Sequence, residues 1–313
     1  ILATAIFDRE WGFQLAVRKF ICDDMPALLA FIESIQPDGG DLGRDLRQKM
    51  FQQVLEQPDM DPEVNCLLLE EGGSLLGYCL VFPEPSIRRA VLGSDLARDV
   101  AGGPLERELV RHAIGRAREV DAREIHLCLA GGSSRYKLLE EEGFSRVRVY
   151  WDMLWDLDSL PDASPQDGFT LRGFAPGDAA ALTDVQNAAF TGSWGFAPNT
   201  VEQIAYRANM ANTSHDGIRF LHHGESLAGY CWTCVVPDGS ATKGVIGMIG
   251  VAPEYRGQGI SKPLLLDGMA YLRSVGVASL GLHVDGSNTP AIRLYTSVGF
   301  EKVGELHWYE IKG

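Results

Sequence analysis

Residues 251–261 combine one arginine with two glycines, between a hydrophobic stretch and a helical pattern. Residues 245–251 are mostly β-branched or apolar, and leucines recur at helical spacing after residue 263. Glycine lets backbone amides approach a ligand, and a helix start presents unpaired N–H groups and a partial positive charge. We therefore expect this loop, called the cradle below (residues 251–261), to bind an anion such as pyrophosphate, with Arg256 adding a charge-assisted hydrogen bond.

The cradle sequence resembles the acetyl-CoA signature of the GNAT family of N-acetyltransferases, V-x-P-x-Y-R-G-x-G-[IL]. The residues that match are Val251, Pro253, Tyr255, Arg256, Gly257, Gly259 and Ile260. A dinucleotide fingerprint would need glycine where the chain has Lys262, and no Gly-Lys-Ser/Thr of a Walker loop is present. The resemblance implies that acetyl-CoA binds as co-substrate. We expect it to contact Arg256, Gly257, Gln258, Gly259, Ile260 and Ser261.

A second motif, N-x-x-A-x-x-x-Y followed by Gly299-Phe300, resembles the other GNAT signature. Asn288 and Tyr295 are two helical turns apart, so they share one helix face. A phenol with a reference pKa of about 10 can protonate a thiolate whose conjugate acid has a pKa near 8.5. We expect Tyr295 to contact the cofactor as general acid, unless its ring only packs in the core. Asn288 is expected to bind the pantetheine arm, to cap the helix, or to do both.

No sequence motif identifies the general base or the oxyanion donors directly. The resemblance implies oxyanion donors among the backbone N–H groups of Ile249, Gly250 and Val251, where two strands of this fold separate. Members of the family often carry a glutamate before the cradle, but residues 245–251 contain no carboxylate. His283 alternates away from its apolar neighbours and is our expected base. The alternatives are a strand histidine without a role, or water relaying to a distant carboxylate.

The chain contains two copies of one unit. Arg18, Phe20, Asp24, Ala27 and Leu28 match Arg172, Phe174, Asp178, Ala181 and Leu182 at an offset of 154 (172 − 18). Residues 74–79 match 226–231 at an offset of 152 (226 − 74), and Gly143-Phe144 matches Gly299-Phe300 at 156 (299 − 143). Matches in one order at a nearly constant offset indicate a tandem repeat. Residues 156–167, rich in Pro, Asp and Ser, form the expected linker.

The predicted fold class is α/β, with two tandem GNAT-like domains at 1–156 and 157–313. Each is expected to be a mixed, mostly antiparallel sheet flanked by helices. The first copy should open with a strand at 13–20 and a helix at 24–34. In the second copy we expect strands at 170–174, 219–222, 226–236, 248–251, 280–284 and 306–311. Its expected helices span 178–190, 201–210, 261–275 and 290–298.

The first copy has lost the site residues. At an offset of 156, Arg256, Gly257, Gly259, Asn288 and Tyr295 correspond to Val100, Ala101, Gly103, Gly132 and Leu139. We expect residues 1–156 to be a degenerate, non-catalytic copy, in which Gly102, Gly103 and Arg98 retain at most weak anion binding. The tandem arrangement, with strings at 187–190 and 229–233, resembles the mycothiol synthase family. That resemblance implies the amino group of a cysteinyl pseudodisaccharide as acceptor, and the missing glutamate departs from it.

Composition narrows the function classes. The 313 residues are 45% hydrophobic and carry a formal charge of −14, which argues against a disordered chain and against general nucleic-acid binding. No apolar run approaches the roughly 18 residues of a membrane span. The six cysteines form no disulfide or zinc pattern, and Cys231 and Cys234 should face opposite sides of a strand. We expect a cytoplasmic monomer or homodimer without metal, membrane or nucleic-acid partners.

The predicted function is acetyl-CoA-dependent N-acetylation of a primary amine on a small molecule, by direct attack of the amine on the thioester. The alternatives are a mycothiol synthase proper or a non-catalytic acyl-CoA sensor. Trp194, Phe196 and Trp232 are candidates to line the acceptor pocket or to belong to the core.

Overall fold

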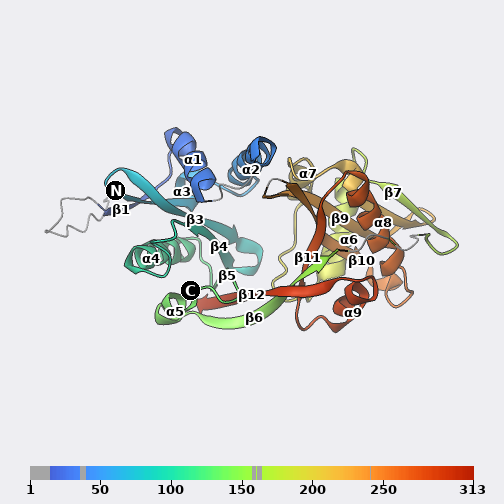
Figure 1. Ribbon diagram of the computed structural model, residues 1–313. Coiled ribbons are helices and arrows are strands. Elements are labelled where there is room, and N and C mark those ends of the chain that lie inside the picture. Colours follow the sequence, from blue (N-terminus) through green and yellow to red (C-terminus); the bar gives the residue numbers. More distant parts are fainter. Residues whose placement is uncertain (1–14, 36–39, 157–159, 161–163, 240) are drawn as a thin grey trace. The chain divides into compact units, whose positions relative to one another are not determined.

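The computed structural model describes residues 15–35, 40–156, 160, 164–239 and 241–313 (Figure 1). Residues 13 and 14 of the predicted first strand and half of the predicted linker, residues 157–159 and 161–163, lie outside this part of the chain. The chain divides into two compact units. Unit 1 comprises residues 1–37, 54–149 and 305–313, and unit 2 comprises 38–53 and 150–304.

Unit 1 is a mixed sheet with helices. Its elements are β1 (Leu15–Lys19), η1 (Cys22–Asp24), α1 (Met25–Ile35), α3 (Pro62–Asn65), β2 (Cys66–Glu71), β3 (Ser74–Glu84), η2 (Pro85–Ile87), β4 (Arg89–Leu96), α4 (Pro104–Glu119), β5 (Glu124–Ala130), α5 (Tyr136–Glu141), the start of β6 (Ser145–Trp155) and the end of β12 (Glu301–Lys312). Its strands follow the order β1-β2-β3-β4-β5-β12. Only the β4–β5 pair is parallel among these pairs.

Unit 2 repeats this plan. Its elements are most of α2 (Gly40–Leu55), the end of β6, β7 (Phe169–Gly173), α6 (Ala179–Phe190), α7 (Val201–Ala208), η3 (His215–Gly217), β8 (Ile218–His223), β9 (Ser226–Asp238), β10 (Ala241–Val251), η4 (Pro253–Tyr255), α8 (Ser261–Ser274), β11 (Ser279–Asp285), α9 (Thr289–Ser297) and the start of β12. Its strands follow the order β6-β11-β10-β9-β8-β7, in which only β10 and β11 are parallel. The predicted fold class is confirmed.

The compact units differ from the sequence halves 1–156 and 157–313, because three elements cross between them. The last residues of β6 pair with β11 in unit 2, from Trp155↔Leu280 to Tyr150↔Asp285. The last residues of β12 pair with β5 in unit 1. Most of α2 belongs to unit 2, where Gln53 accepts hydrogen bonds from the Tyr206 hydroxyl at 2.8 Å and the Ala211 amide at 2.7 Å.

The predicted elements of the second copy are present, with shifted ends. The helix after the cradle ends at Ser274, and Gly276 follows with a φ of +79°, as expected of a glycine stop. The main difference is β10, which begins at Ala241 rather than at residue 248. Gly247 lies in a bulge between Ile246 and Met248 and interrupts the alternation that a sequence pattern needs.

Two cores hold the sheet of unit 2. On one face, α8 and α9 bury apolar residues against β9, β10 and β11, among them the fully buried Leu264, Leu265 and Met269. On the other face, Leu182 of α6 and Ile204 of α7 pack in a separate core. Residues of β9 and β10 therefore lie between two close-packed layers, which fixes their backbone, whereas β11 contributes residues to the first core only.

The repeat reappears in atomic detail. The Arg18 guanidinium donates to both oxygens of Asp24 at 2.5 and 2.7 Å, and Arg172 donates to Asp178 at 2.6 and 3.1 Å. Both carboxylates also accept a backbone N–H three residues earlier in the chain. These matched contacts confirm the internal repeat that was predicted from the same residues.

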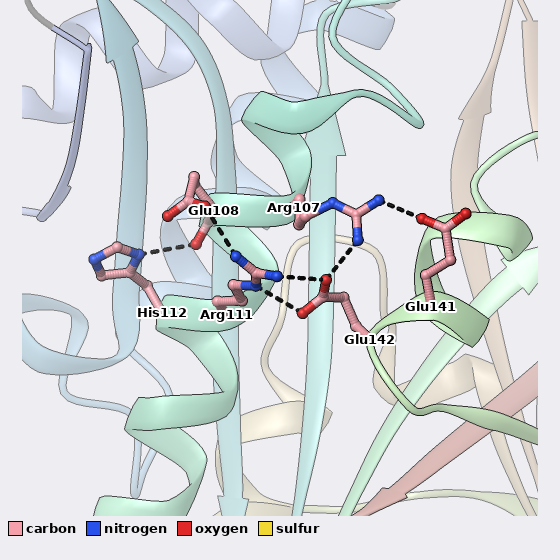
Figure 2. A network of polar contacts seen from close by, with 6 residues as sticks. All are labelled: Arg107, Glu108, Arg111, His112, Glu141 and Glu142. Carbon is pink, nitrogen blue, oxygen red and sulfur yellow. Dashed lines mark hydrogen bonds and ion pairs between the residues drawn. The ribbon is translucent and has the colours of Figure 1, made fainter. Parts of the chain in front are cut away.

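A polar network joins α4 to the end of α5 in unit 1 (Figure 2). Its members are Arg107, Glu108, Arg111, His112, Glu141 and Glu142. Glu142 accepts hydrogen bonds from Arg111 at 2.8 Å and Arg107 at 2.7 Å, and these bonds lower the pKa of its carboxyl group. Since a depressed folded-state pKa stabilises the folded protein above the unfolded pKa, this contribution is lost as the pH falls through the folded value.

Among the residues that the structure describes, no helix combines the length and the apolar character needed to cross a membrane.

Candidate active site

The central feature of unit 2 is the separation of its two parallel strands. β10 and β11 pair at Lys243↔Ser279, Gly244↔Leu280 and Val245↔Gly281, and the pairing stops there. β10 nevertheless continues to Val251, where it remains paired with β9. The second half of β10 therefore has a ladder on one side only, as the resemblance implied.

Backbone alternation decides which amides face the open side of β10. Ala252 N donates to Ala228 O at 2.9 Å, so residue 252 directs its polar groups toward β9. Because these groups alternate along an antiparallel strand, Gly250 also faces β9, whereas Ile249 and Val251 direct theirs toward the β11 side. Two of the three expected oxyanion donors thus lie beyond the last pair of the β10–β11 ladder.

The cradle follows directly and has the backbone that its glycines allow. Gly257 and Gly259 have φ values of +75° and +78°, in the left-handed region that favours glycine. α8 then begins at Ser261, and its N-cap residue Ile260 offers no side-chain hydrogen bond. The first N–H groups of α8 therefore lack a capping side chain, which suits an anion at this end of the helix.

Side-chain bonds fix the cradle in place. One guanidinium nitrogen of Arg256 donates to the carbonyl oxygen of Ala189 at 2.7 Å, at the end of α6. The side-chain amide of Gln258 donates to Glu254 O at 3.0 Å, and Gln166 donates to Gln258 O at 3.1 Å. Arg256 and Gln258 thus support the loop, and Gln166 is a supporting residue that the sequence motifs did not indicate.

Asn288 and Tyr295 lie at the two ends of α9. The Asn288 side-chain oxygen accepts the Ala291 N–H at 3.2 Å, so the expected capping role is present, and its amide N–H groups are left to donate. Tyr295 is 7% exposed and packs edge-on against Phe300, with ring centroids 5.9 Å apart. Its hydroxyl has no hydrogen-bond partner among the described residues, and burial raises its pKa. The phenol therefore keeps its proton at neutral pH.

His283 lies on β11, opposite a carboxylate. Its side chain is 51% exposed, whereas Leu282 and Val284 are buried, as the alternation predicted. Its Nε2 lies 3.4 Å from Oδ1 of Asp152 on β6. Partial burial lowers the pKa of the imidazole, Asp152 raises it, and Lys243 lowers it further. Asp152 was not among the sequence candidates, because no motif contains it.

Of the three aromatic candidates for the acceptor pocket, one belongs to the core and two lie in the loop after α6. Trp232 is buried in the core on the α6 side, and its Nε1 donates to Thr213 Oγ1 at 3.4 Å. Phe196 stacks on Phe190, with centroids 5.8 Å apart. Trp194, in the loop after α6, lies 6.1 Å from the ring of Tyr150 on β6. Trp194 therefore lies beside the strand that carries Asp152.

The corresponding cradle of unit 1 is filled by its own carboxylate. Glu106, at the first turn of α4, is fully buried and accepts the Gly102 N–H at 2.6 Å. Arg135 donates to the other oxygen of Glu106 at 2.5 Å. At the offset of 156, Glu106 corresponds to Lys262, so an acidic residue replaces a basic one. The amide expected to retain weak anion binding already has an anionic partner.

Other groups of ligand-type residues lie outside this site. Glu124, His126 and Glu310 of unit 1 place ligand atoms within 4.8 Å of one another, and no other such group occurs among the described residues. The ammonium of Lys312 lies 3.0 Å from Glu124 and 2.7 Å from Glu310, where a cation would bind. The six cysteines are free thiols, and Cys231 and Cys234 belong to cores on opposite faces of β9.

Unit 1 also holds a cavity of about 440 Å³ beside α5. Its lining residues are Leu129, Ala130, Gly132, Ser133, Tyr136, Glu140, Arg146, His307 and Tyr309. None of the expected site residues of the second copy lines it, so this cavity is separate from the cradle and from Tyr295.

Comparison with known proteins gives consistent matches. The model of the acetyltransferase (GNAT) family matches residues 179–300. A mycothiol acetyltransferase of Thermomonospora curvata is 33% identical over 252 residues, covering 75% of this chain and 78% of the relative. Another, from Stackebrandtia nassauensis, is 37% identical over 175 residues, covering 53% and 55%.

Solved structures show the same fold. A GCN5-related N-acetyltransferase from Sphaerobacter thermophilus superposes with a TM-score of 0.71 at 23% identity and covers 95% of both chains. A tandem GNAT protein from the clavulanic acid biosynthesis pathway has a TM-score of 0.71 at 15% identity, with 95% and 98% coverage. The superposition with a tandem GNAT protein thus extends over nearly the whole length of this chain.

Proposed function

Because the chain belongs to the GNAT family of acetyltransferases, we propose that it moves an acetyl group from acetyl-CoA to a primary amine of a small molecule, at the separated ends of β10 and β11. The observation that carries this proposal is the combination of that separation with an uncapped helix start at α8. The separation leaves amides for a thioester oxygen, and the helix start suits a pyrophosphate.

Each part of the site has a role in binding. The N–H groups of the cradle, from Gly257 to Ser261, and the start of α8 hold the pyrophosphate. Arg256 fixes the cradle to α6 through Ala189 and keeps its remaining N–H groups for the anion. The side-chain amide of Asn288 donates to the pantetheine arm. Bound acetyl-CoA supplies the acetyl thioester on which the amine acts.

The proton transfers follow from the chemistry of the groups. His283 accepts one proton from the substrate ammonium, which leaves a neutral amine. The amine nitrogen bonds to the thioester carbon, and the N–H groups of Ile249 and Val251 stabilise the oxyanion. The C–S bond breaks, Tyr295 donates its proton to the departing sulfur, and the nitrogen loses a second proton to give the amide. The second proton restores the phenol, directly or through water.

Isothermal titration calorimetry of the full chain with acetyl-CoA tests the first step. We expect binding with a micromolar dissociation constant and acetyl-dependent thiol release with at least one member of a panel of primary amines. Absence of binding would remove the basis of the proposal. Binding without turnover on any amine would favour the alternative of an acyl-CoA sensor.

The relatives favour one acceptor class. The curated relatives compared above are named mycothiol acetyltransferases, and one of them aligns over 78% of its length. We propose a cysteinyl amine of the mycothiol type as the first acceptor to assay, with simple primary amines beside it. Residues 245–251 contain no glutamate, and this departure from the family pattern argues against an acceptor of the mycothiol type. A clear preference for simple amines would direct the assignment to another small-molecule acceptor.

The two copies are proposed to have different roles. The second copy carries the cradle, Asn288 and Tyr295, and the residues that the family model matches, 179–300, lie within it. The first copy has Leu139 in place of Tyr295, and its cradle amide is bonded to Glu106. We therefore propose that acetyl transfer occurs in the second copy alone and that the first copy does not bind CoA.

Substituting alanine at Gly257 should weaken acetyl-CoA binding about 5- to 30-fold. A Cβ in the left-handed region costs about 1–2 kcal/mol, and the loop can relieve this strain only by turning its amides away. Gly276→Ala is a matched control, because its φ of +79° is similar and both positions have open space around the added carbon. Calorimetry should show lower affinity only for the cradle variant; equal affinities would exclude the cradle from binding.

A further inference from the structure

Asp152 is the residue that faces the expected base. Asp152 and His283 are direct partners in the antiparallel β6–β11 ladder, so their side chains leave the sheet on the same face. The Nε2–Oδ1 distance is 3.4 Å, slightly longer than a normal N–H···O bond. The two groups are thus set to form a carboxylate–imidazole pair.

One oxygen of Asp152 is otherwise unexplained. Its Oδ1 is buried, and among the described residues it has no hydrogen-bond partner. A buried carboxylate oxygen without a donor is destabilising, so such an atom calls for a functional reason. Nε2 of His283 lies 3.4 Å from this oxygen and is a donor in the tautomer that carries its proton there. The orphaned oxygen is therefore the one that points to the imidazole.

The residues of β6 on either side of Asp152 show which face of the sheet it occupies. Met153 and Trp155 point to the opposite face and are buried in the core with α8 and α9. Asp152 interrupts this apolar strand on the other face, where Tyr150 lies two residues away beside Trp194. The carboxylate and an aromatic pair thus occupy the face from which an amine would reach His283.

We propose that Asp152 is a positioning residue for His283, and that the base of the acetyl transfer is an Asp152–His283 dyad. This inference rests on the proposed function and names the partner that its base requires. The carboxylate accepts the Nε2–H of the imidazole and fixes the tautomer with a free Nδ1. Nδ1 then takes the proton of the substrate ammonium, and the Asp152 carboxylate stabilises the imidazolium.

The dyad also explains how the second copy works without a strand glutamate. Asp152 precedes the linker and belongs, by sequence, to the first copy, yet β6 delivers it to the sheet of unit 2. The first copy, which has lost its own site residues, thereby contributes one residue to the site of the second copy. Residues 157–313 alone lack this carboxylate.

The charges around His283 set the sign of the expected pH effect. Asp152 on β6 raises its pKa and Lys243 on β10 lowers it, while Asp285 lies on the same face of β11 and bonds to Ser287. Removing the Asp152 charge should therefore lower the pKa of His283. Because the base must be neutral, activity is lost as the pH falls through this pKa, and the acid limb should move to lower pH.

The test uses Asp152→Asn in the full chain. We expect kcat to fall about 10- to 100-fold with little change in acetyl-CoA affinity, and the acid limb of kcat/KM to move to lower pH. NMR titration of the histidines, with the His283 signal assigned from His283→Gln, should show the same fall in pKa without substrate. Asp152→Glu should restore part of both, whereas Asp184→Asn, an exposed aspartate on α6, should change neither.

The outcomes separate the dyad from the proposed function. An unchanged His283 titration in Asp152→Asn overturns the dyad, even if activity falls, since a merely structural role would also lower activity. A shifted titration with restoration by glutamate supports it. If the native chain binds acetyl-CoA and acetylates no amine, the proposed function fails, and the NMR titration still decides the pairing.

Discussion

Replacing Tyr295 with phenylalanine should lower kcat about 100- to 1,000-fold and leave the dissociation constant of acetyl-CoA unchanged. The hydroxyl is the only group removed, and general acid catalysis typically contributes factors of this order. The fold should tolerate the change, because the ring is buried against Phe300 and the hydroxyl has no hydrogen-bond partner among the described residues. Thiol release under saturating substrate measures kcat, and calorimetry measures the affinity.

The same change in a buried tyrosine of unit 1, Tyr309→Phe, serves as control and should leave turnover intact. The raised pKa of Tyr295 adds a second expectation. An acid whose pKa is raised remains protonated into the alkaline range, so the native enzyme should show no loss of activity from this group near pH 10. Turnover that is equal in Tyr295→Phe and the native chain would remove the phenol from the mechanism.

Replacing Glu106 with alanine should destabilise unit 1 by about 3–5 kcal/mol, the usual cost of leaving one member of a buried ion pair alone. Arg135 would lose its carboxylate, and the Gly102 N–H would lose its acceptor. Urea denaturation of the full chain should show an earlier transition. The affinity for acetyl-CoA should stay unchanged, since the residue lies in the copy without the site.

Two neighbouring variants make this result specific. Glu106→Gln keeps an oxygen for Gly102 and should lose less stability than alanine. Glu108→Ala removes a carboxylate whose partner Arg111 is largely solvent-exposed, and it should change the denaturation midpoint little. If Glu106→Ala unfolds at the same urea concentration as the native chain, the buried pair in the degenerate cradle is not stabilising.

Local features of the site were predictable from sequence. The positive φ values at Gly257 and Gly259 follow from glycine, and α9 begins at Thr289 because Asn288 caps it and Pro290 suits its first turn. The alternation that turns His283 away from the core needed only the pattern of β11. Each of these inferences depends on residues within about one element, where spacing and residue type determine the structure.

Non-local contacts could not be predicted in this way. Asp152 reaches His283 across 131 positions (283 − 152), through the pairing of β6 with β11. The bond from Arg256 to Ala189 depends on where α6 ends, and the support of Gln258 by Gln166 depends on the path of a loop. Sequence spacing carries no signal for such pairs, because they arise only once the sheet has formed. The pairing of Glu106 with Arg135 could not be predicted from the sequence for the same reason.

The pairing of β6 with β11 also determines whether the second copy can be produced as a separate fragment. A fragment that began at the linker would lack residues 150–155, and β11 would become an edge strand whose N–H and C=O groups face solvent. It carries Leu280, Leu282 and Val284 on one face, and an open strand edge with such a face favours pairing with other chains. The strand that brings the carboxylate to the site therefore also protects the sheet against self-association.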